Sequence, residues 1–319
     1  MSARPGLWAI TSYFNPAGYR RKLVNYRAFR ERLDVPLVAV EQGFDGCFEL
    51  EAGDADILVR VQGGAVLWQK ERLLDLGRQV LPPDCETVAW LDCDVVFDAP
   101  DWAELARAAL ERLDLVHLFH ERHNLPPDEP LDRLGSWSVP PTRSLVHLLD
   151  LGMAEPDELK LGSTAGLGWA MRREALDRHG FYDACILGGG DRVMLNAAYG
   201  RFDLGRRAQR MNARRAEHYL AWARPFFNTV RGRVGSIPGR LFHLWHGDLR
   251  DRRYEARFAL LEHFDPFTDI ALDAGGCWRW ASAKADLHEA IRRYFEERNE
   301  DGVEPALAPG GAVVARTAG

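Results

Sequence analysis

Lysine and cysteine are both scarce in this chain of 319 residues. Only Lys22, Lys70, Lys160 and Lys284 are lysine, so the other 37 of the 41 basic residues are arginine. The five cysteines are odd in number, widely spaced and without a C-x-x-C pair. This pattern argues against a disulfide framework and against a structural zinc site, and it favours a reducing compartment.

Long apolar runs and an excess of positive charge are also missing. No stretch of about 18 apolar residues occurs, and the first residues lack the apolar run of a signal peptide. We therefore expect a soluble cytoplasmic protein. The net charge of −6 and the pI near 6.0 argue against a general nucleic-acid binder.

The remaining composition is that of a folded domain. With 46% hydrophobic and 28% charged residues, the chain can bury a real core. We expect one domain over residues 1–299. Residues 300–319 are dominated by Gly, Ala, Pro and Val, and this composition predicts a disordered tail.

Short β-prone runs alternate with segments of helical periodicity, which predicts an α/β fold with a mixed, mainly parallel sheet flanked by helices. A proline-rich and polar segment at 124–142 indicates an excursion or lid. The expected strands are 7–11, 36–40, 57–61, 87–91, 115–119 and 241–245, and the expected helices are 19–33, 66–76, 100–113, 172–178, 191–199, 250–263 and 284–298.

The strongest chemical signal is the segment VAWLDCDVVF at 88–97, an apolar strand followed by Asp92 and Asp94. Two carboxylates at a strand end offer the hard oxygen ligands that Mg²⁺ and Mn²⁺ prefer, and a divalent cation there can bridge protein and phosphate. The alternative is a solvated turn. We interpret the pair as a candidate metal and nucleotide site.

Two further segments carry candidate groups. Three glycines at 188–190 precede Asp191 near a helix start, where its carboxylate could act as a general base or simply cap the helix. Later, HLWHG at 243–247 offers His243 and His246 as partners of Asp94 in a metal site. If this segment is a strand, the two imidazoles point to opposite faces, which predicts that only one of them binds metal.

Some residues are candidates for contacting the nucleotide. Lys70, on a helix before the Asp92 strand, could reach phosphate groups, although a solvated helix face is the competing interpretation. Tyr13 and Asn15 follow the first strand, where an α/β sheet presents its ligand crevice, and core packing is the alternative.

Other candidates concern the acceptor. Glycines 166 and 168 with Trp169 could shape a sugar pocket, together with Gly189 and Gly190, although Trp169 could instead belong to the core. Three histidines spaced by three residues imitate a metal stripe, but their sequence LVHLFHERH is typical of a strand and loop, so we interpret them as structural. They are His117, His120 and His123.

A basic segment separates Asp191 from the late histidines. Ten arginines and only two acids lie between Arg201 and Arg240. A solvated surface is one interpretation of these arginines. A basic wall that faces a diphosphate, a lipid-linked acceptor or an anionic membrane is an equally good one.

Taken in order, LDCDVVF, GLGWAMRREAL, GGGDRVML and HLWHG resemble the GT-A fold nucleotide-sugar glycosyltransferases, in particular the inverting, galactosyltransferase-like type. The resemblance implies that Asp94 binds the metal and the diphosphate, and that Asp92 contacts ribose or metal. It implies Asp191 as the catalytic base and His246 or His243 as the late ligand of Mn²⁺ or Mg²⁺. Arg192 stands where inverting members often carry a second acid.

We therefore expect a metal-dependent enzyme that moves a sugar from a nucleoside diphosphate donor, a UDP-sugar first of all, to the hydroxyl of a saccharide or glycolipid. Peripheral contact with a membrane through the arginine-rich segment would fit such an acceptor. Two alternatives remain: a phosphatase of the haloacid dehalogenase type, with Asp92 as nucleophile and Asp94 as acid, and a non-catalytic protein that binds a saccharide or a partner.

Overall fold

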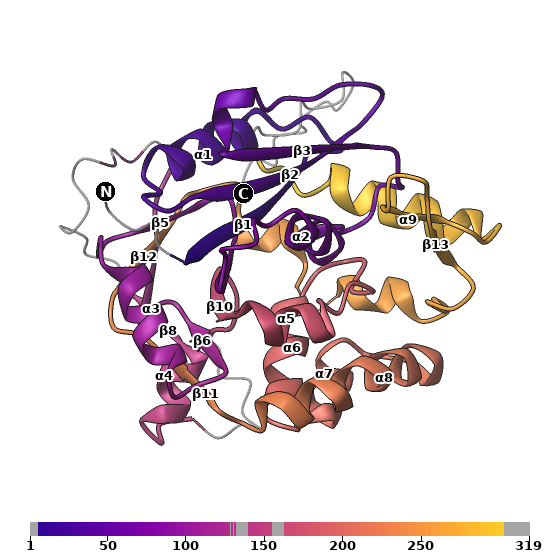
Figure 1. The fold of residues 1–319 in the computed structure, drawn as a ribbon. Helices are drawn as coiled ribbons and strands as arrows, with labels where there is room; N and C mark the ends of the chain where they lie inside the picture. Colours follow the sequence, from indigo (N-terminus) through magenta and orange to yellow (C-terminus); the bar gives the residue numbers. More distant parts are fainter. Residues whose placement is uncertain are drawn as a thin grey trace, which may run out of the picture.

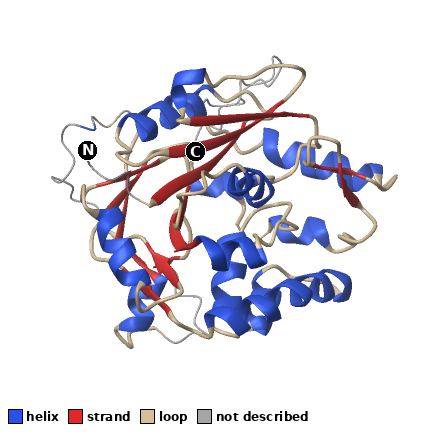
Figure 2. Cartoon of the chain, in the orientation of Figure 1, coloured by secondary structure: helices blue, strands red, loops and turns tan. Residues whose placement is uncertain are grey.

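A seven-stranded sheet forms the centre of the protein (Figures 1 and 2), in a computed structural model that describes residues 6–127, 129, 131, 140–154, 163–254 and 256–302. The strand order is β11-β6-β10-β4-β1-β2-β3. Its strands are β1 (Leu7–Phe14), β2 (Leu37–Gly43), β3 (Ile57–Gln62), β4 (Thr87–Leu91), β6 (Leu115–His117), β10 (Gly168–Arg172) and β11 (Val234–Ser236).

Only β10 runs against its neighbours β4 and β6, whereas the other pairs in this sheet are parallel. The predicted fold class, a mixed and mainly parallel sheet flanked by helices, is therefore confirmed. Parallel strands end at the same edge, so the carboxyl ends of β1, β2 and β4 meet where Asp92 and Asp94 follow β4.

Helices cover both faces of the sheet (Figure 2). They are α1 (Arg20–Glu31), α2 (Lys70–Gln79), α3 (Trp102–Leu110), α4 (Leu145–Asp150), α5 (Arg173–His179), α6 (Gly190–Ala198), α7 (Phe202–Ala208), α8 (Ala213–Val230) and α9 (Ala285–Glu296), with 3₁₀ turns η1 (Ala52–Asp54), η3 (Leu249–Arg252) and η4 (Arg257–Leu261).

The alternation of side chains along β1 divides the core into two clusters. Leu7 and Ala9 pack in the cluster of α1 and α3, whereas Trp8 and Ile10 pack in the cluster of α2, α5 and α6. This period of two is the one expected for a strand buried on both faces. The strand is therefore fixed in register, and so is the edge that carries the candidate site.

A second sheet, which the sequence did not predict, joins the Asp94 segment to the late histidines. Its order is β5-β12-β7-β8-β9. Antiparallel pairing of β5 and β12 sets His243 opposite Val95, and the Leu244 amide donates to the Asp94 carbonyl at 2.8 Å. The five strands are β5 (Val95–Phe97), β7 (Glu121–Asn124), β8 (Thr142–Ser144), β9 (Ser163–Thr164) and β12 (Arg240–His243); β13 (Ile270–Leu272) and β14 (Trp278–Trp280) form a separate hairpin.

Several predicted elements need correction. The helix expected at 250–263 is instead two 3₁₀ turns, η3 and η4, because Arg253 adopts a left-handed conformation with φ of 43° between them. The helix expected at 66–76 begins only at Lys70, after Gly63 and Gly64, which both have positive φ. The predicted lid at 124–142 lies in part outside the described residues.

The predicted domain boundary at residue 299 is too early. Glu300 is only 1% exposed and packs into the domain, and Asp301 contacts α1. Residues 303–319, where we expect a disordered tail, lie outside the described residues. Within the described ranges, no helix combines the length and the apolar character needed to cross a membrane.

Helix α1 allows a direct test of this packing. Phe29 is 1% exposed and its ring lies edge-on to Tyr26, whereas Val24 on the same helix is 56% exposed. We expect Phe29→Ala to lower the free energy of unfolding by about 3–5 kcal/mol, because it removes a buried ring and leaves a cavity. Val24→Ala should change it by less than about 0.5 kcal/mol. Urea denaturation of both variants measures the difference, and equal effects would contradict the assignment of this face.

Candidate active site and metal centre

The turn after β4 directs its two carboxylates to different partners. Asp92 forms an ion pair with Lys70, and its amide is held by the Leu167 carbonyl at 2.9 Å. Asp94 faces His243 and His246. The two aspartates therefore begin two adjoining groups, one anchored by a lysine and the other by histidines.

Asp94, His243 and His246 form a group that could hold a metal ion. The Asp94 Oδ2 atom lies 3.1 Å from His246 Nε2, and Oδ1 lies 3.8 Å from His243 Nε2. The two Nε2 atoms are 3.2 Å apart. The prediction that the histidines point to opposite faces is wrong, because β12 ends at His243 and its alternation does not extend to His246. Both imidazoles, not one, reach the candidate site.

The neighbours of each ring bear on what these atoms can offer. Arg252, which can only donate, lies 2.9 Å from His246 Nε2, and Asp94 Oδ2, which as a carboxylate oxygen accepts, lies 3.1 Å from the same nitrogen. His243 Nδ1 lies 3.1 Å from the side-chain amide oxygen of Asn124, an acceptor that favours the proton on Nδ1 and leaves Nε2 of His243 without one. Asp94 Oδ1 is buried and has no hydrogen-bond partner among the described residues.

Possible ligand atoms of all three side chains thus lie within 4.8 Å of one another, an arrangement that a cation stabilises. One carboxylate and two imidazoles suit Mn²⁺ and related divalent metals. Burial opposes the charge of Asp94, but the nearby His246, His243 and Arg252 outweigh it and lower the pKa of Asp94. Burial lowers the pKa of His243 well below its ordinary value, so this side chain is neutral as a ligand must be.

Lys70 is the centre of the second group. It is only 6% exposed, and its ammonium pairs with Asp92 and, at 2.9 Å, with Asp191. Burial alone would lower the pKa of Lys70, but the two carboxylates raise it, so it stays charged. The interpretation of Lys70 as a residue on a solvated helix face is therefore wrong. Its first role is to neutralise two carboxylates from distant parts of the chain.

Asp191 lies in the first turn of α6, where the helix dipole favours a negative charge. Gly188 and Gly189, with φ of 82° and 86°, turn the chain into this helix. The backbone of Gly166 also lies against the carboxylate, since a Cβ there would be 3.0 Å from Asp191 Oδ2. The side chain is 19% exposed and so remains reachable by a ligand.

Glu71 also belongs to this group, although no sequence pattern singled it out. It is 6% exposed, and a Cβ on Gly190 would lie 2.1 Å from its Oε1 atom, so only glycine fits there. Burial, together with the charge of Asp191, raises the pKa of Glu71 to about 8, although Lys70 opposes this. Gly190 therefore serves helix packing against Glu71.

Most other predicted contact residues are structural. Tyr13 is 1% exposed, and its hydroxyl donates to Glu49 at 2.7 Å. Asn15 bonds to the backbone of Tyr19 and to Glu49. Trp169 is fully buried and donates to the Ala165 carbonyl, so it cannot contact an acceptor.

Gly168 lies beneath Leu91 and Leu118 inside the core, so it too is no acceptor contact. Gly189 turns the backbone into α6. His117 is buried between Ser144 and the Gly166 carbonyl, which agrees with the structural interpretation. His120 stacks on His147.

The arginines from Arg201 to Arg240 do not form one wall at the site. Helices α7 and α8 lie apart from β5 and β12 (Figure 1), and Arg206, Arg214 and Arg240 pair with nearby acids. Two buried arginines near His246 come from later segments: Arg252 of η3 contacts His246 itself, and Arg298, beyond α9, pairs with Glu300. In the sequence, only the position of Arg252 shortly after His246 and that of Arg298 just after the last helix pointed to these arginines.

No protein-family model matches the chain, and no curated protein matches it. Solved structures similar to it include S. aureus TarS 1-349, with 13% identity and a TM-score of 0.36 over 92% of this chain and 71% of that one. The mannosyltransferase PcManGT from Pyrobaculum calidifontis, in complex with GDP-Man and Mn²⁺, has 15% identity and a TM-score of 0.34 over 72% and 74%.

A third similar structure is 4-diphosphocytidyl-2C-methyl-D-erythritolsynthase from Anaerococcus prevotii. It has 13% identity and a TM-score of 0.30, over 73% of this chain and 88% of that one. All three TM-scores lie below 0.5.

Glu71 predicts a pH dependence of stability. Its pKa is about 8 in the folded protein against an ordinary 4.5, so between these values the folded protein holds a proton that the unfolded chain has lost. The free energy of unfolding from this group therefore falls as the pH rises from about 5 to 8. We expect Glu71→Gln to flatten that fall in urea titrations. Glu111→Gln, at an exposed position, should leave it unchanged, and an unaltered slope in Glu71→Gln would contradict the assignment.

Proposed function

We propose that this protein is a metal-dependent glycosyltransferase that moves a sugar from a nucleoside diphosphate sugar to an acceptor hydroxyl. The observation that carries the proposal is the convergence of Asp94, His243 and His246 beside the Lys70–Asp191 pair, at the carboxyl end of β4. A metal-binding group and a reachable carboxylate next to each other are what a diphosphate leaving group and a hydroxyl nucleophile require.

The residues of the first group would hold the donor. Asp94, His243 and His246 are the proposed ligands of Mn²⁺ or Mg²⁺, which when bound offsets negative charge on the leaving diphosphate. Arg252 adds a fixed positive charge beside His246. Asp92 lies next to this group, and we propose that it contacts the donor ribose or the metal while Lys70 neutralises it.

Asp191 would act on the acceptor. The ammonium of Lys70 keeps the carboxylate oriented, and the backbone of Gly166 restricts it on another side. We propose that it takes the proton of the acceptor hydroxyl as that oxygen attacks the anomeric carbon from the side opposite to the diphosphate, which inverts the configuration. A UDP-sugar is the first donor to test, and a saccharide or glycolipid is the proposed acceptor.

The arginine-rich segment has a separate place in this proposal. Arg206, Arg207 and Arg210 line a surface hollow of about 590 Å³ with Asp203 and Met211. This surface, rather than the site itself, is where we propose peripheral contact with an anionic membrane that carries a lipid-linked acceptor.

The phosphatase alternative is less well supported. It needs Asp94 as a proton donor, but His246, His243 and Arg252 lower the pKa of Asp94 despite its burial. The alternative of a non-catalytic binding protein is also less well supported, because such a protein needs neither the metal-binding group of Asp94 nor the buried charged group around Lys70.

Asp94→Ala tests the metal-binding group. We expect this variant to lose Mn²⁺-dependent binding of nucleoside diphosphates, because one of three proposed ligands is gone. Isothermal titration calorimetry with UDP and GDP, with and without Mn²⁺, measures the loss. Asp101→Ala is the matched control. Asp101 is exposed, precedes α3 and is not part of the metal-binding group, so this variant should bind as the native chain does. Unchanged Mn²⁺-dependent affinity in Asp94→Ala would show that the donor binds elsewhere.

Asp191→Asn separates catalysis from donor binding. We expect nucleotide affinity to be retained and transfer to fall by about 10²–10⁴, the usual contribution of a general base. Release of nucleoside diphosphate from the donor sugar in the presence of acceptor saccharides gives the rate. Asp203→Asn on α7 serves as the control. Native turnover by Asp191→Asn would remove its role as base.

A further inference from the structure

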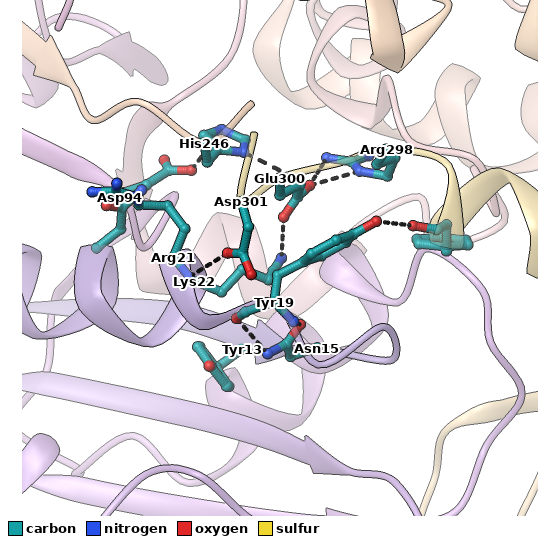
Figure 3. Close-up of polar contacts among 12 residues, drawn as sticks. Tyr13, Asn15, Tyr19, Arg21, Lys22, Asp94, His246, Arg298, Glu300 and Asp301 are labelled. Carbon is teal, nitrogen blue, oxygen red and sulfur yellow. Dashed lines mark hydrogen bonds and ion pairs between the residues drawn. The ribbon is translucent and has the colours of Figure 1, made fainter. Parts of the chain in front are cut away.

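The chain beyond α9 returns to the metal-binding group. Residues 298–302, which we call the C-terminal strap, pass between His246 and the start of α1 (Figure 3). In this close-up Glu300 points toward His246 on one side and Lys22 on the other, while Arg298 lies to its right. The strap is therefore part of the wall of the candidate site, although its residues 300–302 were expected to belong to a tail.

Hydrogen bonds hold the strap to α1. The Asn299 amide donates to the Tyr19 hydroxyl at 3.0 Å, and Asp301 accepts from the amides of Arg20 at 3.2 Å and Arg21 at 2.8 Å. Helix α1 has no side-chain cap of its own at Tyr19. Asp301 therefore supplies the missing N-terminal acceptor from the other end of the chain.

The residue after His246 has to be glycine for the strap to fit. Gly247 has φ of 85°, and a Cβ there would lie 2.6 Å from the Asn299 carbonyl oxygen and 3.0 Å from Glu300 Cα. The glycine of the HLWHG segment is thus explained by close backbone approach. His246 and Glu300 are held together by this contact between their loops.

Glu300 offers its carboxylate to the rear of the His246 ring. The side chain is 2% exposed, and Oε1 lies 3.7 Å from His246 Nδ1. The same oxygen accepts from Arg298 Nε at 2.6 Å, and Oε2 lies 3.6 Å from Lys22 Nζ. Arg298 and Lys22 neutralise the buried charge, so the carboxylate can stay ionised while it faces the imidazole.

The tautomer of His246 follows from its two neighbours. Glu300 faces Nδ1 and Arg252, which can only donate, faces Nε2, so both neighbours favour the ring with its proton on Nδ1. In that tautomer Nε2, the nitrogen beside Asp94, carries no proton and is the one that a cation can bind. A carboxylate behind the far nitrogen is the usual way in which a metal-binding histidine is oriented.

We propose that Glu300 is a positioning residue for the metal centre: it holds His246 in the tautomer and orientation that present Nε2 to a divalent cation. The proposal rests on the proposed function, because it assumes that His246 binds metal. The competing role for Glu300 is a purely structural ion pair with Arg298. The two roles differ in what removal of Arg298 alone should do.

The test measures Mn²⁺ binding to the full chain without any substrate. Titration calorimetry gives the affinity. Electron spin echo envelope modulation gives the number of imidazole nitrogens coupled to Mn²⁺. We expect two coupled imidazoles in the native chain. In Glu300→Ala we expect one coupling to be lost and the affinity to fall about 10–100-fold. Glu300→Gln, which keeps an acceptor oxygen, should retain both couplings with a smaller loss.

Arg298→Gln is the matched control. It breaks the same ion pair but leaves the Glu300 carboxylate against His246, so both couplings and near-native affinity are expected. Two couplings and native affinity in Glu300→Ala would overturn the proposal, and so would an equal loss in Arg298→Gln. If Glu300→Ala does not fold, Glu300→Gln decides: affinity equal to that of Arg298→Gln overturns the role, and lower affinity supports it. A native chain that binds no Mn²⁺ would instead refute the metal centre itself.

Discussion

The pairing of β5 with β12 is the constraint on which the candidate site depends. It brings the residues after β4 beside a segment almost 150 positions later in the chain, and it sets Val95 against His243 (Figure 1). Because the Leu244 amide also bonds to the Asp94 carbonyl, the backbone around the aspartate and the histidine is one rigid unit. The acceptor atoms of Asp94, His243 and His246 meet as a consequence of this pairing.

Placing these acceptor atoms close together costs free energy, and other residues of the site offset that cost. Buried carboxylates and lone pairs that face one another are unfavourable unless positive charge lies between them. Lys70 supplies that charge for Asp92 and Asp191, and Arg252 lies beside His246. Lys22 and Arg298 do the same for Glu300. Residues from both ends of the chain thus stabilise a centre that the main sheet only begins.

Local patterns predicted much of this, but not the long-range parts. The apolar run before Asp92 and the glycines before Asp191 have clear periodicity and turn chemistry, so the main sheet and the start of α6 were foreseeable. The burial of Lys70 and Glu71 was not foreseeable, because the sequence of a helix does not show whether its polar residues face solvent or a neighbouring element. The alternation rule failed for His243 and His246 because β12 ends at His243. Glu300 was not predicted, because it stands at the border of a low-complexity segment that was interpreted as a tail.

The most direct measurement of the central claim is a crystal structure grown with Mn²⁺ and a nucleoside diphosphate, with diffraction recorded at the manganese absorption edge. We predict one anomalous peak bonded to Asp94 and to Nε2 of both His243 and His246, with the diphosphate on its open side. A peak at another set of residues, or a nucleotide bound at the β4 edge with no metal at this group, would contradict the proposed centre.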